Sequence, residues 1–537
     1  MAGFTIFGPE RPAVLALSIG AAVSFALYLV GITLHRLFFH RIAHIPGPKL
    51  AALTYYYQSY YDFFPHQGQF LFKLEQLHNK YGPIVRIGPD EVHVNDSKFY
   101  KEMYGSSTHK RNKSPLWYWM HGLGAVGDQS MFITLDHDHH RLRKAGLGTY
   151  FSKRKVQELE PRVREKVLLL RQRLLERAGG DAVNLKDAFG GMALDIITQY
   201  CFNRCFGALD RPDLGRELNQ LMGVGVKINP LGRTFPTLAR TVMGLPKWAL
   251  SWSGLVSTTG AFLDLADRLS SEARNEAIRD LADGKYSQTD DADSRTVLHS
   301  MMRSDVLPAH EKTEKRLQAD GMTLIAAGFD TTSRTLTVIF YHLLTKAHLR
   351  ARVLEELRTL MPSPHSPLPT VAQLEQLRYL TCVIHEGTRL AHGVAGRLVR
   401  IAPEEDLEYD SPWDGRRYTI PRGTTFGQSS YLVHTDEAIY PDAAEFDPDR
   451  YWSDDGQPPT DAQRALVAFG KGTRMCSGIN LAFAELYLTI AALVGTVDMR
   501  IAPGTTERDV TLVQELFVGV LPDNPGVRVD VVGTLQA

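Results

Sequence analysis

The sequence predicts a mainly α-helical protein with a small β-sheet region, preceded by one N-terminal transmembrane helix. An uncharged apolar run near the N-terminus is long enough to cross a bilayer. Apolar residues then recur at helical spacing, most clearly at 69–81, 157–177 and 315–345. Strand-like alternation is limited to short stretches at 82–94, 397–400, 417–421 and 424–426.

The uncharged run covers residues 13–34, and about 22 residues at 1.5 Å per residue span roughly 33 Å. A cleaved signal peptide is the alternative, but its apolar run is usually shorter. Arg36, Arg41 and Lys49 follow the run, whereas Arg11 alone precedes it, so the chain beyond is expected on the cytoplasmic side. Residues 1–40 are therefore predicted to be a membrane anchor.

Length and composition favour one large domain after this anchor. No Pro/Gly/Ser-rich linker or block of charge divides the rest of the 537 residues, so residues 41–537 are predicted to form a single domain. Lys and Arg total 60, as do Asp and Glu, which leaves no basic surplus for binding a nucleic acid.

The cysteines are too few and too scattered for a secreted disulfide framework, which favours a reducing compartment. They are Cys201, Cys205, Cys382 and Cys476. Cys201 and Cys205 are close enough in sequence to hold a metal, but no second pair follows them. Their apolar neighbours favour positions in the core.

Two further patterns imitate cofactor or metal sites. The glycine-rich run at 122–127 resembles a dinucleotide fingerprint, but no clear helix follows it, so a flexible loop is expected. His137, His139 and His140 have the composition of a metal site, and a zinc hydrolase is one alternative. His139 and Arg143, however, lie four residues apart, so both can reach one anionic group from a single helical face.

The long helix predicted at 315–345 has an unusual centre, Ala-Ala-Gly-Phe-Asp-Thr-Thr at 326–332. Glycine and adjacent threonines weaken a helix, and threonine hydroxyls compete for its carbonyls, so a local opening is expected there. Water or dioxygen would fit such an opening. A buried helix with a satisfied polar notch is the alternative.

Cys476 lies in a glycine-rich loop at 469–478 that leads directly into an apolar helical run. Backbone N–H groups and a positive helix end favour its thiolate, so the sulfur is expected to be an iron ligand or a nucleophile. Phe469 would shield the sulfur, glycines such as Gly478 would admit a flat partner, and Arg474 adds a cation. These features favour a planar, doubly carboxylated iron group, with Cys476 as its axial metal ligand. A free core cysteine is the alternative.

The loop fits the pattern Phe-x-x-Gly-x-Arg-x-Cys-x-Gly and resembles the haem-binding signature of the cytochrome P450 family. The resemblance implies a cytochrome P450 fold and a haem b, iron protoporphyrin IX, ligated by Cys476. It also implies that Phe469, Arg474 and Gly478 help to bind this cofactor.

Other segments resemble the same family, in the same order along the chain. The run at 326–332 resembles its oxygen-binding groove and places Asp330 and Thr331 as a catalytic acid–alcohol pair. His139 and Arg143 resemble its haem-propionate pair, with histidine where many members have tryptophan. Arg397 is expected to hold a second propionate.

The sequence also contains the parts of a structural Glu–Arg–Arg triad like that of the family. Glu386 and Arg389 lie one helical turn apart, and the segment at 446–450 is like the family's Phe-x-Pro-x-Arg. Arg450 is therefore expected to complete a buried triad that supports the fold. An ordinary surface ion pair is the alternative.

The resemblance implies a haem-thiolate monooxygenase that uses O2 and electrons from NADPH-cytochrome P450 reductase. Cytochrome b5 is a second expected partner, and Lys144, Lys153 and Lys471 are candidates for a docking face. The expected location is the endoplasmic reticulum membrane, crossed once, with the catalytic domain facing the cytosol. A haem-thiolate isomerase or peroxygenase and a non-catalytic haem sensor are the alternatives.

Segments at 391–394 and 430–434 look most like fungal enzymes of secondary metabolism, including the trichodiene-oxygenase type. This likeness implies a lipophilic small-molecule substrate of terpenoid or polyketide origin. The segment at 221–252 is expected to be a membrane-touching lid or a helical hairpin packed on the core. Resemblance also nominates an apolar pocket formed by Leu116, Trp117, Phe329, Val394 and Phe517.

Overall fold

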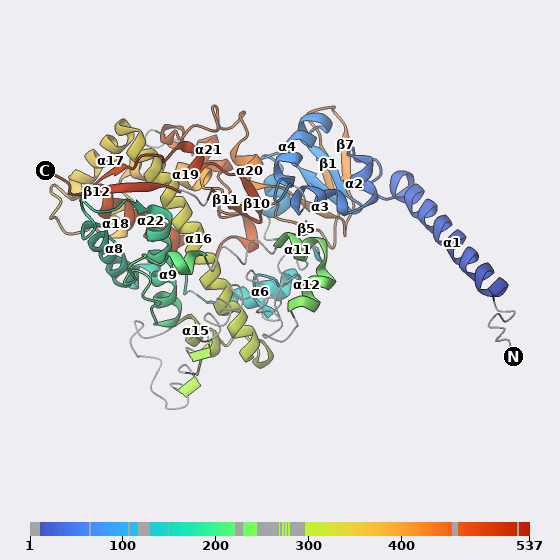
Figure 1. The fold of residues 1–537 in the computed structure, drawn as a ribbon, viewed down its shortest axis with the longest axis horizontal. Coiled ribbons are helices and arrows are strands. Elements are labelled where there is room, and N and C mark those ends of the chain that lie inside the picture. The colour runs from blue at the N-terminus through green and yellow to red at the C-terminus, as the bar shows by residue number, and fades with distance from the viewer. Residues whose placement is uncertain are drawn as a thin grey trace, which may run out of the picture.

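The computed structural model describes residues 11–63, 66–105, 108–115, 129–148, 150–220, 229–243, 296–453, 460–522 and 526–536, and a few residues between 268 and 279. Figure 1 shows a helical body from which one helix projects. The longer helices are α1 (Arg11–Leu34), α4 (Phe70–Tyr81), α6 (His137–Gly146), α8 (Glu160–Leu175), α9 (Leu185–Phe202), α16 (Glu314–Thr345), α17 (Ala347–Leu360), α19 (Arg378–Leu390) and α22 (Ile479–Val494). The shorter helices are α2 (Lys49–Leu53), α3 (Tyr56–Asp62), α7 (Lys153–Glu158), α11 (Asn229–Thr234), α12 (Pro236–Met243), α15 (Val297–Arg303), α18 (Val371–Leu374), α20 (Ser430–His434) and α21 (Asp461–Ala465).

Helix α1 extends away from the body (Figure 1), and its apolar segment is not buried against any described part of the chain. The segment Val14–Phe39 is long and apolar enough to cross a membrane. Its large apolar side chains are exposed, Leu17 by 74% and Phe25 by 61%. Because such a surface is unfavourable in water, a lipid environment accounts for it, as the predicted anchor requires.

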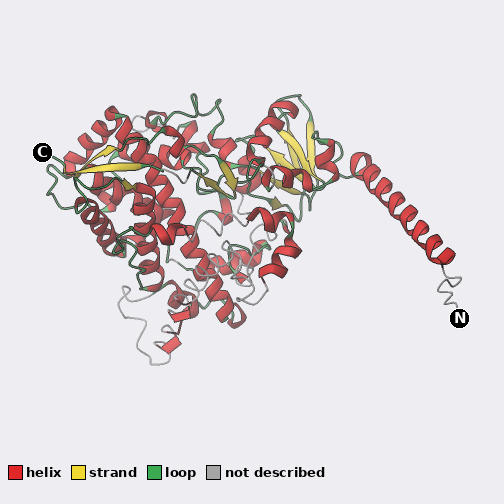
Figure 2. Cartoon of the chain, viewed as in Figure 1, coloured by secondary structure: helices red, strands yellow, loops and turns green. Residues whose placement is uncertain are grey.

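The strands, yellow in Figure 2, form several small sheets. The largest has the order β1 (Ile84–Gly88), β2 (Glu91–Val94), β8 (Thr425–Gly427), β5 (Arg400–Ile401) and β3 (Asn112–Lys113). A second joins β4 (Val183–Asn184), β12 (Arg528–Thr534) and β9 (Val497–Ile501). Two hairpins pair β6 (Leu407–Asp410) with β7 (Arg417–Ile420), and β10 (Gln514–Leu516) with β11 (Val518–Val520).

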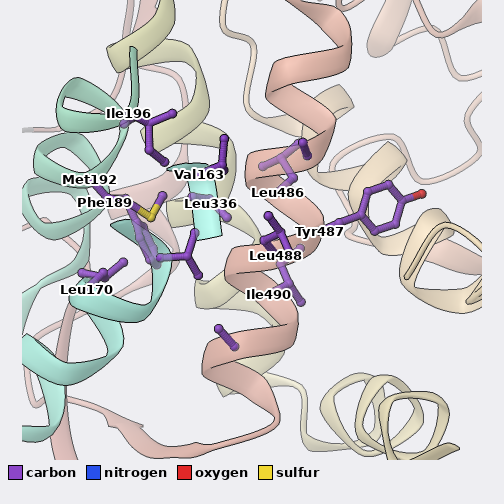
Figure 3. Close-up of a cluster of buried hydrophobic side chains, with 14 of the residues drawn as sticks. Val163, Leu170, Phe189, Met192, Ile196, Leu336, Leu486, Tyr487, Leu488 and Ile490 are labelled. Atoms are coloured by element: carbon purple, nitrogen blue, oxygen red, sulfur yellow. The ribbon is translucent and has the colours of Figure 1, made fainter. Parts of the chain in front are cut away.

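The main core lies where α8, α9, α16 and α22 pack together. In Figure 3, side chains from these helices point into the space between them, among them Leu170, Phe189, Leu336 and Leu488. Gly328 allows α16 to approach α9 closely, because a Cβ there would lie 2.8 Å from Ile197 Cγ1. This packing fixes α16 and the start of α22 relative to each other.

The predicted fold class is confirmed: the chain is mainly helical, with small sheets and one N-terminal apolar helix. The predicted local opening in α16 was wrong, because this helix runs without a break from Glu314 to Thr345. Its threonine hydroxyls bond to carbonyls one turn back without displacing the helical bonds. The core position expected for Cys205 was also wrong. Asn203 adopts a left-handed φ of 54° and ends α9, which leaves Cys205 exposed.

Some expectations fall on residues that the structure does not describe. They are the loop at 122–127, the pocket residues Leu116 and Trp117, and most of the segment at 221–252. Of that segment, α11 and α12 are described.

Candidate active site

The loop that carries Cys476 is folded tightly against its neighbours. Gly472 has a left-handed φ of 74°, and a Cβ on it would lie 1.9 Å from the carbonyl oxygen of Tyr104. Only glycine fits this approach. The N–H of Cys476 donates to the carbonyl of Phe469 over 2.9 Å, and α22 begins shortly after, at Ile479. The sulfur therefore stands at the positive end of α22.

The thiol of Cys476 is accessible on one side, although protein atoms surround it on the others. Burial raises its pKa, whereas the N–H of Gly478 and the ammonium of Lys144 act in the opposite direction. A Cβ on Gly478 would meet nothing within 4 Å, so the accessible side has room for a flat group. A metal ion bound to the sulfur would hold it as the thiolate.

Buried basic side chains gather beside this loop. Arg474 donates to the carbonyls of Thr134 over 2.9 Å and Leu135 over 2.7 Å, and burial, followed by the charge of Arg400, lowers its pKa to about 9. Arg400 is 5% exposed, and burial lowers its pKa too. Within the described parts of the chain, neither guanidinium forms an ion pair with a carboxylate. Burial and these two arginines lower the pKa of Lys113 as well.

Such a group of like charges is unfavourable unless an anion lies among them. Haem carries two propionate carboxylates at one edge of a flat ring. These would neutralise the cations while the ring reaches Cys476. The donor set, the accessible sulfur and the open space at Gly478 therefore fit a haem.

The face of α6 that carries His139 and Arg143 binds carboxylates of the protein instead. His139 Nε2 lies 2.8 Å from Glu311 Oε1, and Arg143 Nη2 lies 2.8 Å from Asp320 Oδ2. Both carboxylates are buried, so each already neutralises the positive charge of its partner on α6. The expectation that His139 and Arg143 hold a propionate is corrected accordingly.

The next face of α6 lies against the cysteine loop. Lys144 Nζ donates to the carbonyls of Thr473 over 3.1 Å and Met475 over 2.8 Å. His140 is buried, and burial, followed by the charge of Arg474, lowers its pKa to about 2, so its imidazole is neutral. The sequence did not single out this pair. His139 and Arg143 have the same four-residue spacing as His140 and Lys144 and lie one position before them, so spacing alone does not choose between the two pairs.

Arg397 also has partners within the protein. Its Nε donates to Glu91 Oε1 over 2.6 Å and its Nη2 to Gln58 Oε1 over 2.6 Å. Arg400, in β5, has no carboxylate partner among the described residues. The second propionate contact is therefore expected from Arg400 rather than Arg397.

Halfway along α16, the helix presents an accessible surface within the body of the protein. Ala326 and Ala327 are exposed, although most residues of the C-terminal half of α16 are buried. Thr331 Oγ1 donates to the carbonyl of Ala327 over 2.9 Å. Asp330 Oδ2 lies 3.2 Å from Arg334 Nη2. The predicted acid–alcohol pair thus lies next to exposed residues of α16.

A second acid, not found from the sequence, lies next to this pair. Glu485 of α22 is 2% exposed and accepts a hydrogen bond from the hydroxyl of Thr332. Burial raises the pKa of this carboxyl well above its ordinary value. The sequence signal for this residue is a single acidic side chain, Glu485, within the otherwise apolar run of α22.

The residues of the expected triad do come together. Arg389 donates to both carboxylate oxygens of Glu386 over 2.7 Å each, and Arg450 Nε donates to Glu386 Oε1 over 3.1 Å. Glu386 and Arg389 are completely buried. Arg389 also donates to the carbonyls of His434 and Ala443, so the triad ties α19 to the segment before η6 (Pro448–Tyr451).

The described pocket candidates border the same region. Phe329 is buried in α16, and Val394 is half-buried. Phe517, between β10 and β11, has a ring centroid 6.0 Å from that of Phe132. The segment with Val394 approaches the active site, since a Cβ on Gly393 would lie 3.6 Å from the methyl carbon of Thr331.

The histidine-rich start of α6 does not form a metal site. Among the described residues, no group of three or more His, Cys, Asp or Glu side chains is arranged to hold a metal ion. His137 Nδ1 instead accepts a hydrogen bond from the N–H of Arg111 over 3.2 Å. The zinc-hydrolase alternative therefore has no geometric support.

Comparison with known proteins identifies the family. The family model "Cytochrome P450" matches residues 46–526. The chain is 81% identical over 519 residues to cytochrome P450 monooxygenase ucsK of an Acremonium species, covering 97% of this chain and 98% of that protein. It is 37% identical over 520 residues to cytochrome P450 monooxygenase tpcC of Cochliobolus heterostrophus, covering 94% and 95%. It is 32% identical over 508 residues to cytochrome P450 monooxygenase TRI4 of Fusarium sporotrichioides, covering 94% and 93%. The chain therefore belongs to the cytochrome P450 family and is a monooxygenase.

Proposed function

We propose that this monooxygenase is membrane-anchored and oxidises a lipophilic small molecule of fungal secondary metabolism, of terpenoid or polyketide origin. The observation that carries the proposal is the placement of Cys476 at the start of α22 beside buried arginines that lack carboxylate partners among the described residues. This donor set suits a haem rather than a metal ion alone.

The proposed cofactor is haem b, whose iron Cys476 would ligate. Arg400, Arg474, Lys144 and the neutral His140 are the residues proposed to hold its propionates, and Phe469 is proposed to shield the sulfur. When bound, a haem with a thiolate ligand supplies the oxidation chemistry, using O2 and two electrons. NADPH-cytochrome P450 reductase is the proposed electron donor, and cytochrome b5 is a second one.

Thr331 and Asp330 are proposed to deliver protons. The Thr331 hydroxyl donates to the carbonyl of Ala327, and its oxygen keeps lone pairs free to accept a hydrogen bond from a bound ligand or water. Arg334 holds the Asp330 carboxylate at 3.2 Å on a partly exposed part of α16, where it can collect a proton and pass it on. Glu485 supports the same region through its hydrogen bond with Thr332.

The anchor is proposed to cross the endoplasmic reticulum membrane once, with the catalytic domain in the cytosol. Support comes from the exposed apolar helix at Val14–Phe39 and from Arg36, Arg41 and Lys49 after it. The reductase is proposed to dock near the cysteine loop. Lys144, Lys153 and Lys471 are the candidates there; Lys153 pairs with Glu375, and Lys144 and Lys471 each donate to backbone carbonyls.

The substrate class is tested by producing the protein in membranes together with the reductase. Terpenoid and polyketide intermediates are then supplied separately, and NADPH consumption and products are measured. We expect one class to stimulate NADPH consumption and to give a product heavier by one or more oxygen atoms. If neither class stimulates consumption or yields such a product, the proposed substrate class is wrong.

A further inference from the structure

Two segments that resemble fungal enzymes of secondary metabolism lie against each other in the structure. One, 391–394, follows α19, and the other, 430–434, forms α20. The ring centroid of His392 lies 4.8 Å from that of Tyr431 and 6.4 Å from that of His434. His392 therefore stands at the contact between the two segments.

His392 has an unusual backbone conformation. Its φ of 47° is left-handed, a region that glycine adopts freely and that costs energy for a residue with a Cβ. Residues in such conformations cluster at functional sites, where the surrounding structure holds them in place. The imidazole of His392 is therefore a candidate for a functional task.

This imidazole is buried and has an unpaired nitrogen. The residue is 7% exposed, and its Nδ1 has no hydrogen-bond partner among the described residues. Burial, followed by the charges of Arg389 and Arg334, lowers the pKa of His392 to about 3, so the ring is neutral at neutral pH. A neutral imidazole has one N–H and one nitrogen that accepts a hydrogen bond.

Two neighbours of His392 have unpaired donors within the described parts of the chain. Arg334 on α16 is 2% exposed, and its Nε and Nη1 have no partner. A Cβ on Gly519 would lie 2.6 Å from the carbonyl oxygen of His392 and 3.6 Å from Arg334 Nη1, so this guanidinium ends beside His392. His434 Nε2 accepts the N–H of Val467 over 3.0 Å, which leaves the proton of this ring on its unpaired Nδ1.

The unpaired atoms of these three side chains complement a water molecule. Arg334 and the Nδ1–H of His434 can only donate, so they cannot satisfy each other. Because these neighbours are donors, the tautomer of His392 with a bare Nδ1 is favoured. One water can accept hydrogen bonds from Arg334 and His434 and donate one to His392, as buried waters do between otherwise unpaired polar groups.

Arg334 connects this group to the acid of α16. Its Nη2 lies 3.2 Å from Asp330 Oδ2, and 23% of the Asp330 side chain is exposed. Gly393 follows His392 in the chain, and a Cβ on Gly393 would lie 3.6 Å from the methyl carbon of Thr331. His392 is thus linked to both members of the acid–alcohol pair.

A buried arginine that only supports the fold is held differently. Arg389 donates from Nε, Nη1 and Nη2, to the carboxylate of Glu386 and to three backbone carbonyls. Arg334 uses Nη2 alone among the contacts described, so its pair with Asp330 does not fix the guanidinium by itself. A further contact at Nε or Nη1 would hold it in one orientation.

We propose that Arg334, His392 and His434 bind a buried water that keeps the Arg334 guanidinium against Asp330, which makes His392 a positioning residue for proton delivery. His392 acts through Arg334 rather than by contact with the reacting atoms. A carboxylate held in one orientation transfers protons more efficiently than one that rotates. The inference rests on the proposed role of Asp330 and Thr331.

Two substitutions of His392 separate its nitrogen from its packing. His392→Phe keeps a ring against Tyr431 and removes the acceptor, whereas His392→Asn loses the ring but keeps a polar side chain that tolerates a left-handed φ. His342→Phe is the matched control. His342, also on α16, is buried with an unpaired Nδ1, and its ring stacks on that of Phe446 at 4.5 Å.

The variants are produced at full length with haem, in membranes that contain the reductase. His392→Phe should lower oxidised product per NADPH by roughly fivefold and raise hydrogen peroxide, because it removes one positioning hydrogen bond. The substrate KM should stay within about twofold of wild type, since binding is not affected. His392→Asn should stay within about twofold of the wild-type ratio, although it packs less well. His342→Phe should match wild type.

The water itself is tested by crystal structures of the full-length haem protein. We expect an ordered water within hydrogen-bond distance of Arg334, His392 and His434 in the wild type, and its loss in His392→Phe. A dry contact or a different molecule at this place would overturn the proposal.

An unchanged product ratio in His392→Phe would also overturn it. A larger loss in His392→Asn than in His392→Phe would do the same, since it would show that packing matters and the nitrogen does not. If His392→Phe does not retain haem, Arg334→Lys gives the comparison, because it keeps a cation for Asp330 and loses the donors to the water. A wild-type protein that forms no oxidised product would instead refute the proposed function, while the crystal structures still test the water.

Discussion

Replacing Thr331 with alanine separates a catalytic role of its hydroxyl from a structural one. The hydroxyl donates to the carbonyl of Ala327, one turn back, over 2.9 Å. Thr335 makes the same bond to the carbonyl of Thr331, also over 2.9 Å. Because both threonines lie on α16 and lose the same kind of bond, Thr335→Ala is a matched control.

The two substitutions should affect stability alike and catalysis differently. Each removes one hydroxyl–carbonyl bond, worth about 1 kcal/mol, and alanine recovers roughly half of this through its higher helix propensity. Both variants should therefore unfold within about 1 kcal/mol of wild type. A positioned proton donor contributes about 10²–10⁴-fold to a rate, so Thr331→Ala should lower oxidised product per NADPH by roughly tenfold or more.

The assay uses membranes that contain the reductase and a substrate that the wild-type protein oxidises. NADPH consumption, oxidised product and hydrogen peroxide are measured together, with the carbon-monoxide spectrum as the measure of intact haem protein. In Thr331→Ala, consumption should continue and hydrogen peroxide should replace the lost product. The proton-delivery role would be refuted if Thr331→Ala and Thr335→Ala gave the same product per NADPH as wild type.

Three further predictions concern stability and the anchor. Glu386→Gln should lower the free energy of unfolding by about 3–5 kcal/mol, because it leaves buried guanidinium groups uncompensated. Asp410→Asn, which breaks an exposed ion pair, is the control and should leave the denaturation midpoint unchanged. Burial lowers the pKa of His78 and of His385 to about 4. Between pH 6.5 and 4 the unfolded chain therefore binds more protons than the folded protein, so the free energy of unfolding should fall as the pH is lowered through this range. Denaturant titrations at several pH values measure this, and a flat profile would contradict it. Deleting residues 1–34 should release much of the protein from membranes with haem retained. Asn95-Asp96-Ser97 is a glycosylation sequon, so glycosylation of the full-length chain at Asn95 would show that the proposed topology is reversed.

Much of the fold could be predicted because its signals are local. The uncharged run predicted α1, and apolar periodicity predicted α4, α8 and α16 to within a few residues. The end of α9 was missed because Asn203 stops the helix through a left-handed backbone conformation, which apolar periodicity does not reveal. The uninterrupted course of α16 depends on hydroxyls that bond back to carbonyls, and the residue types alone allowed either outcome.

The parts of the proposed site that lie within one short segment could be predicted from the sequence. The loop around Cys476 and the pair of Asp330 and Thr331 needed no long-range information. The proposed propionate contacts depend on the register of α6 and of the strand at Arg400, and a shift of one residue in α6 exchanges His139 for His140. The carboxylate partners of these cations lie far away in the sequence, as Glu311 does from His139. Only the tertiary structure therefore shows which cations have no carboxylate partner among the described residues.

The most direct test of the account is the spectrum of the reduced, carbon-monoxide-bound protein. A haem with a thiolate ligand from Cys476 should give a Soret band at long wavelength, and Cys476→Ser should abolish it. Cys382→Ser provides a control, because Cys382 is a buried core cysteine whose thiol pKa burial raises to about 12. Retention of the band in Cys476→Ser, or its loss in Cys382→Ser alone, would contradict the assignment of the haem ligand.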